Sequence, residues 1–196
     1  MSETPQIFRI KPALLVGARD YHLYADRLEV WHKDDLVDTV AYTDIQSARF
    51  AETSAREYKF RRIDLFTGAE KPHRIHVTSS IASNRNNDPD VGSFYDFVSA
   101  LSTHLSPIHP EMSVTFGETQ KATWIMFLIG LSAILTTAGM LALAIATNVP
   151  DYKLKNAMTP FGMLFLFGLY ICFTSNPWKS KPRLTWDGIG ELTRTL

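Results

Sequence analysis

Cysteine is almost missing from this sequence. The 196 residues include one cysteine, Cys172, which lies inside an apolar run. A single cysteine excludes an internal disulfide and a cysteine-rich zinc site, and it is compatible with a domain that faces the cytoplasm. The first residues also lack a basic region followed by an apolar stretch, so we expect no secretory signal.

Charged residues are missing from two long stretches near the C-terminus, Ala122–Pro150 and Asn156–Trp178. The apolar centre of the first, Trp124–Ala146, forms a helix of roughly 35 Å at about 1.5 Å per residue, enough to cross a hydrocarbon core of about 30 Å. The second has its apolar centre at Ala157–Phe173, which is nearer the minimum length. Each run could be a buried helix of a globular core, but two such runs side by side favour membrane spans.

We therefore predict a transmembrane α-helical hairpin over residues 122–178, with helices at about 123–147 and 157–176. Small residues recur every fourth position in the first helix and predict a close packing face, at Ala138, Ala142 and Ala146. Neither run carries an acidic or basic residue. Ion and substrate pathways usually need such residues, so a transporter or channel is disfavoured.

The basic residues that flank the hairpin set its expected orientation. The side that holds both termini carries the larger group: Lys121, Lys179, Lys181 and Arg183. The connecting loop carries Lys153 and Lys155. We expect both termini in the cytoplasm and a multi-pass protein of the inner membrane.

Up to Lys121 the chain has 14 basic and 17 acidic residues, and beyond it 6 and 3. The first part therefore has the charge of an ordinary soluble domain, and its net acidity argues against nucleic-acid binding. Short strand-like runs with turn signals fill it from Phe8 to Thr78. They indicate about seven antiparallel strands.

The apolar period then changes to that of a helix. One face of this expected helix carries Phe94, Phe97, Val98, Leu101 and Leu105. Ser93 and Asp96 resemble a capping box, and Pro107 is expected to end the helix. The pattern predicts an α+β fold: a small antiparallel β-barrel or sandwich closed by a C-terminal helix.

Three segments carry a resemblance to a known family: Asp26–Val30, Val40–Phe50 after a polar turn, and the closing helix Phe94–Leu101. Their order resembles the pleckstrin-homology (PH) superfold, and the details are similar to bacterial PH-like domains, over about Ile7 to Leu105. The resemblance implies a non-enzymatic interaction module. Other small barrels with a capping helix remain an alternative.

The expected organisation is a PH-like soluble domain at residues 1–110 and a linker at 111–121. The hairpin at 122–178 follows, and a cytoplasmic tail at 179–196 ends the chain.

Basic residues in two places are candidate contacts for lipid headgroups or a partner. The first group is Arg56, Lys59, Arg61 and Arg62, and the second is Lys179, Lys181 and Arg183. Acids interspersed with the first group favour the alternative, a solvated strand face. The basic signature of phosphoinositide-binding PH domains is not matched, because the corresponding region offers only Arg19 beside an acid.

Enzyme motifs are absent from the sequence, and we expect no cofactor or metal site. His73 and His76 are three apart on an expected strand and so project to opposite faces. The sequence favours a non-enzymatic, membrane-anchored adaptor or accessory subunit of a membrane protein complex. The alternative is a lipid-responsive or self-assembling scaffold, whose partner is a second copy of the chain.

Overall fold

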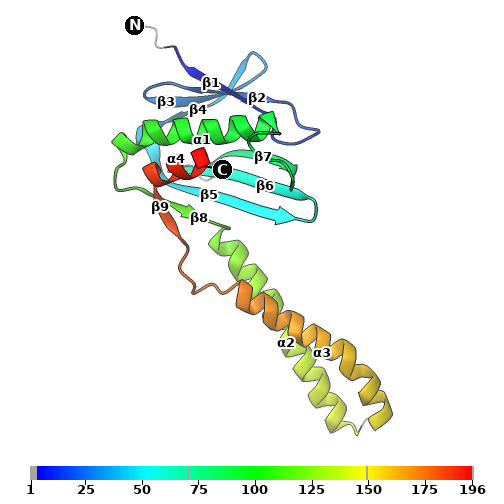
Figure 1. Cartoon of the computed structure of the whole chain (residues 1–196). Helices are drawn as coiled ribbons and strands as arrows, with labels where there is room; N and C mark the ends of the chain where they lie inside the picture. The colour runs from blue at the N-terminus through cyan, green and yellow to red at the C-terminus, as the bar shows by residue number, and fades with distance from the viewer. Residues whose placement is uncertain (1–3, 70, 149, 196) are drawn as a thin grey trace. The chain divides into compact units, whose positions relative to one another are not determined.

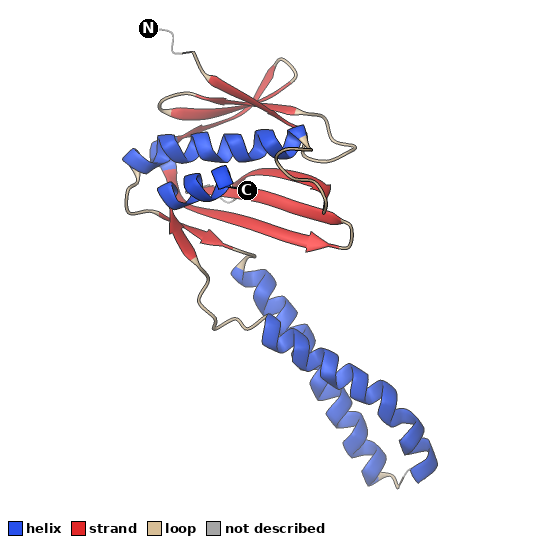
Figure 2. Cartoon of the chain, viewed as in Figure 1, coloured by secondary structure: helices blue, strands red, loops and turns tan. Residues whose placement is uncertain are grey.

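The computed structural model describes residues 4–69, 71–148 and 150–195, and within them it contains two β-sheets and four α-helices (Figures 1 and 2). The chain divides into two compact units. One, here called the sheet unit, combines Met1–Gly117 with Lys181–Leu196. The other, here called the helical hairpin, is Glu118–Ser180.

The first sheet is an antiparallel meander of four strands in the order of the chain. Its strands are β1 (Gln6–Ile10), β2 (Arg19–Leu23), β3 (Arg27–His32) and β4 (Asp35–Ala41). A short 3-10 turn, Tyr42–Asp44, leads from β4 into the second sheet.

The second sheet has five strands in the order β7-β6-β5-β8-β9. Its strands are β5 (Ile45–Ala55), β6 (Tyr58–Thr67), β7 (His73–Ser80), β8 (Ser113–Phe116) and β9 (Arg183–Thr185). β8 runs parallel to β5, and the other neighbours are antiparallel. The expected mixture of strands and helices is therefore present. In the described residues, however, the sheets do not close into a barrel, and the second is not purely antiparallel.

The core lies where helix α1 (Pro89–Ile108) packs against the inner faces of the strands. The ring of Phe97, which is fully buried, lies 5.3 Å from that of Tyr21 and 5.8 Å from that of Phe8. Phe94 faces the second sheet, with its ring centroid 6.3 Å from that of Phe50. The predicted apolar face of the helix thus packs in the core.

The predicted start of this helix was wrong, and its end lies one residue beyond Pro107. The helix starts at Pro89, where the Asp88 carboxylate accepts hydrogen bonds from the backbone N–H groups of Asp90 and Val91, so Ser93 is not its cap. At the other end it continues through Pro107 to Ile108. Pro107 has no backbone N–H to donate to the carbonyl four residues earlier, so it removes one hydrogen bond of the last turn, and the helix ends one residue later.

The segment expected to be a tail instead completes the sheet unit. After β9, helix α4 (Trp186–Thr195) lies beside α1 (Figure 1). Trp186 and Ile189 are buried in the same core as α1. The two helices approach closely at Gly190, where an added Cβ would lie 2.5 Å from the Ser102 hydroxyl oxygen. The expected linker likewise contains a strand, β8.

The helical hairpin consists of α2 (Gln120–Ala146) and α3 (Asp151–Thr174). Both are long and apolar enough to cross a membrane, by length and composition. α3 begins at Asp151, well before the expected start near residue 157, so Lys155 lies in the helix and not in a loop. Pro150 precedes α3 and does not interrupt it, since the first turn needs no N–H donor.

Replacing Ile189 by Ala should lower the free energy of unfolding of the sheet unit by about 2–5 kcal/mol, because it removes a fully buried side chain from the core. The full chain in mild detergent would be unfolded in urea and followed by pulse proteolysis. Thr195→Ala, at an exposed position of the same helix, is the matched control. It should change the free energy of unfolding by no more than about 0.5 kcal/mol. Equal effects of the two substitutions would contradict the docking of α4.

Candidate interaction surfaces

Arg61, one of the predicted contact residues, points into the sheet unit. Its side chain is 2% exposed. The guanidinium donates hydrogen bonds to the Tyr95 hydroxyl at 2.9 Å, the Ser79 hydroxyl at 2.6 Å and the Ser83 carbonyl at 3.0 Å. These partners belong to α1, β7 and the segment between them, so Arg61 ties three parts of the fold together and is not available to a lipid.

The same network includes an acid. The Tyr95 hydroxyl also donates to a Glu52 carboxylate oxygen at 3.4 Å, and Lys59 forms an ion pair with Glu52. Burial raises the pKa of the Tyr95 hydroxyl, and the nearby Glu52 carboxylate raises it further, against the opposing effect of Arg61. Tyr95 therefore stays protonated at neutral pH and remains a hydrogen-bond donor.

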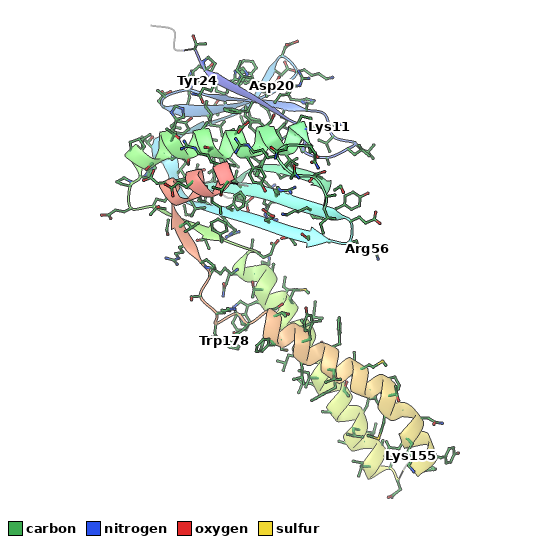
Figure 3. All side chains as sticks on the ribbon, viewed as in Figure 1. Lys11, Asp20, Tyr24, Arg56, Lys155 and Trp178 are labelled. Atoms are coloured by element: carbon green, nitrogen blue, oxygen red, sulfur yellow. The ribbon has the colours of Figure 1, made fainter. Side chains whose placement is uncertain are left out.

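The other residues of the first predicted group do not form one surface. Arg56 is exposed at the turn between β5 and β6, with a φ of +54° (Figure 3). Lys59 lies on the same side of β6 as Arg61, since the two are two residues apart on one strand, and Arg62 lies on the opposite side. The sequence cluster is thus divided between a turn and two faces of a sheet.

Arg62 belongs to a second group of charges, centred on Asp64. The Asp64 carboxylate is fully buried and lies 2.9 Å from Nε of Arg74, 3.5 Å from Nε of Arg62 and 3.8 Å from Nη1 of Arg49. These arginines come from the three neighbouring strands β5, β6 and β7. The sequence alone does not reveal this group, because only the strand register brings Arg49 and Arg74 beside Asp64.

His76 lies on β7 opposite Arg62 and is half-buried. Burial lowers the pKa of its imidazole, and the nearby Arg74 and Arg19 lower it further. His76 is therefore neutral at pH 7. His73 lies on the opposite face, with its Nδ1 2.5 Å from a carboxylate oxygen of Asp38. Among the residues that the structure describes, no group of three or more potential ligands could hold a metal ion.

The second predicted group of basic residues is divided between the two units. Lys179 is exposed in the helical hairpin unit. Lys181 and Arg183 belong to the sheet unit, where Arg183 is exposed and starts strand β9 opposite Thr115. Arg183 is therefore held by a strand and does not lie in a free tail.

Of the predicted packing face of the first helix, Ala138 lines an apolar groove shared with α3. Ala138, Ala142 and Ala146 are all exposed in the structure. The helices approach most closely at two glycines instead, where an added Cβ at Gly168 would lie 2.8 Å from the Gly130 carbonyl oxygen. Small residues do permit the close approach, as expected for helices in lipid, but at another position of the helix.

Aromatic rings pack together where α2 begins and α3 ends. The rings of Trp124 and Trp178 meet edge to face with centroids 5.5 Å apart, and both contact Phe127. At the other end, an apolar groove runs between the helices. Its lining includes Ala138, Leu141, Met158, Phe161 and Gly162.

Comparison of the chain with protein-family models, with curated proteins and with solved structures finds no match.

Arg61→Gln should lower the free energy of unfolding of the sheet unit by about 2 kcal/mol or more, because buried partners lose charge-assisted hydrogen bonds. Arg61→Lys should also lower the free energy of unfolding, because one ammonium group cannot reach partners on three segments as the guanidinium fork does. Urea unfolding of the full chain in detergent measures both. Arg56→Gln, at the exposed turn, is the control and should leave stability nearly unchanged; a similar loss in both variants would contradict the network.

Gly168→Leu should separate α2 from α3, because the side chain meets the Gly130 carbonyl and Ile134. Gly162→Leu is the matched control, since a Cβ at Gly162 meets nothing within 4 Å. The measurement is crosslinking between Cys172 and a cysteine introduced at Phe127, whose carbonyl oxygen lies 3.6 Å from the Cys172 sulfur. The yield should fall severalfold only for Gly168→Leu. Equal yields would show that the glycine contact does not hold the hairpin together.

Proposed function

We propose that this chain is a non-enzymatic, membrane-anchored interaction module that serves as an accessory subunit of a membrane protein complex. The helical hairpin crosses the inner membrane of a bacterium, and the sheet unit is a PH-like domain on the cytoplasmic side together with both termini. The proposal combines the strand and helix order, the apolar helices and the distribution of basic residues.

The observation that carries this proposal is the position of the hairpin within the chain. β8 immediately precedes α2, and β9 follows α3, yet β8 and β9 are hydrogen-bonded neighbours in one sheet. The Phe116 N–H donates to the Pro182 carbonyl at 2.9 Å, which fastens the two connecting segments together. Both hairpin ends are thus tied to the sheet edge, an arrangement suited to holding a domain beside a membrane partner.

The surface of the hairpin supports a partner within the membrane. Only 11% of the most apolar window of each helix is buried within the chain. The uncovered surface includes the small-residue face at Ala138, Ala142 and Ala146 and the aromatic side chains of Phe165, Phe167, Tyr170 and Phe173. The exposed alanines offer a smooth surface that suits close packing by a helix from another subunit.

PH-like organisation is supported by seven strands in two sheets followed by a helix that packs into the core. Folds of this type mostly present surfaces to other molecules, and this analogy is a guide to function only at the level of the fold. The orientation rests on the basic residues near the ends of the hairpin, including Lys121 and Lys179. A reporter that is active only in the cytoplasm, fused after residue 196, should be active.

Ala142→Phe tests the accessory role, because it adds bulk to the small-residue face while leaving the helix apolar enough to insert. The matched control is Leu143→Phe, which also adds an aromatic ring at an exposed position of α2 but on a different face. Purification in mild detergent followed by mass spectrometry should find a stoichiometric partner with the normal chain and with Leu143→Phe. Ala142→Phe should reduce its recovery at least about tenfold, equivalent to about 1.4 kcal/mol.

A stoichiometric partner retained by both variants would mean that the alanine face faces lipid. A pure homo-oligomer would replace the accessory role by the alternative, a self-assembling scaffold.

A further inference from the structure

Four arginines lie on the outer face of the five-stranded sheet, on the side away from the core. The strand register sets residues from all five strands in one row, namely Arg183, Thr115, Arg49, Asp64 and Arg74. Their chain neighbours Val114, Phe50, Ile63, Leu65 and Ile75 are buried in the core. Since successive strand residues point to opposite faces, the row itself points outward.

A second row on the same face adds Arg62, which pairs with Ala51 on one side and His76 on the other. The face thus holds Arg49, Arg62, Arg74 and Arg183, here called the arginine face. Among the described residues that the register places on it, Asp64 is the only acid. With His76 neutral, the net charge is about +3 at pH 7.

Asp64 does not cancel this charge. Its carboxylate is fully buried at the centre of the face, whereas the side chains of Arg49, Arg62 and Arg74 retain 20%, 23% and 50% exposure. Asp64 therefore positions the guanidinium groups side by side, which would otherwise repel each other. Guanidinium groups held in this way present N–H donors in the fork geometry that matches phosphate oxygens.

Aromatic rings accompany the arginines. The guanidinium of Arg49 lies over the ring of Phe66, 5.0 Å from its centroid, and Phe60 is 43% exposed on the same face of β6. Arginines interleaved with partly exposed aromatic rings are suited to a headgroup layer, where both phosphate and apolar groups are present.

The connection to the hairpin is short and limits how far the end of β8 can lie from the start of α2. β8 ends at Phe116 and α2 begins at Gln120. At most about 3.6 Å is spanned per residue, so this connection covers no more than about 14 Å. Arg183 begins β9, the strand hydrogen-bonded to β8, and so lies at the edge of the sheet that is tethered to the hairpin.

We propose that the arginine face binds the phosphates of anionic phospholipids in the membrane that holds the hairpin. This inference rests on the membrane anchorage proposed above and goes beyond it, because it makes the orientation of the sheet unit depend on lipid charge and salt. Phospholipid is favoured over an acidic protein because β8, which contributes Thr115 to this face, is joined to the hairpin by a short connection, and because aromatic rings accompany the arginines.

The test uses the full chain, with Cys172→Ala, reconstituted into vesicles of phosphatidylcholine with or without about one-third phosphatidylglycerol. A fluorophore is attached either at Ser47→Cys, exposed on the arginine face, or at Thr103→Cys, exposed on α1 at the opposite side of the sheet. Lipids with a nitroxide on the headgroup quench a fluorophore that lies at the surface. We expect strong quenching at residue 47 with phosphatidylglycerol, weak quenching at residue 103, and loss of the difference at 0.5 M salt.

Variants then assign the effect to the arginines. Arg74→Gln with Arg183→Gln removes two charges while leaving Asp64 its partners Arg49 and Arg62. Each near-surface cation contributes about fivefold to the docked population, so the ratio of docked to undocked protein should fall roughly 25-fold. Arg9→Gln, in β1, with Lys11→Gln, just after it, changes the net charge equally and should leave quenching unchanged.

Each outcome decides one question. Failure of the chain to float with vesicles would contradict the membrane anchorage itself. Flotation with equal quenching at residues 47 and 103, or with quenching that does not depend on phosphatidylglycerol and salt, would overturn the lipid inference alone. Because these results are obtained with all four arginines in place, they hold even if the double variant fails to fold.

Discussion

The pairing of β8 with β5 on one side and β9 on the other is the constraint on which the rest of the structure depends. The Gly117 N–H donates to the Phe50 carbonyl at 2.9 Å, so the chain leaves the sheet directly from its hydrogen-bonded ladder. Gly117 has a φ of +96°, a conformation that residues with a Cβ rarely adopt. The chain then forms the helical hairpin and returns at Arg183 to the strand it has just left.

This arrangement makes the sheet unit depend on two distant parts of the chain. Trp186 and Ile189 complete a core otherwise built from residues before Gly117. Bringing α4 against α1 closes a loop that contains the whole hairpin, which carries an entropic cost and is characteristic of slow folding. If the hairpin inserts in a membrane first, its two ends are brought together and this cost is reduced. Anchorage and folding of the sheet unit are then coupled through the same residues.

Charges in the second sheet serve two purposes according to the face on which they lie. Arg61 points inward and is buried because the Tyr95 hydroxyl, the Ser79 hydroxyl and a carbonyl accept its hydrogen bonds. Arg62, the next residue, points outward toward Asp64. Because successive strand residues point to opposite faces, Arg61 joins the buried hydrogen-bond network and Arg62 joins the arginine face.

The sequence by itself determined the features that depend on local patterns. The uncharged runs required long apolar helices, and the spacing of Phe94, Phe97 and Leu101 required a helix with one buried face. The short alternating runs before residue 80 indicated strands, because period and turn residues are encoded within a few positions.

Only the tertiary structure decided which distant residues meet. Residues 179–196 read as a tail because α4 is short and its apolar residues gain a partner only from α1. Likewise, Ala142 and Gly168 are both small residues, but the close approach of the helices at Gly130 leaves no room for the methyl group that alanine carries. The arginines at positions 49, 62, 74 and 183 form one surface solely because the strand register aligns them, and register depends on pairing across the whole sheet.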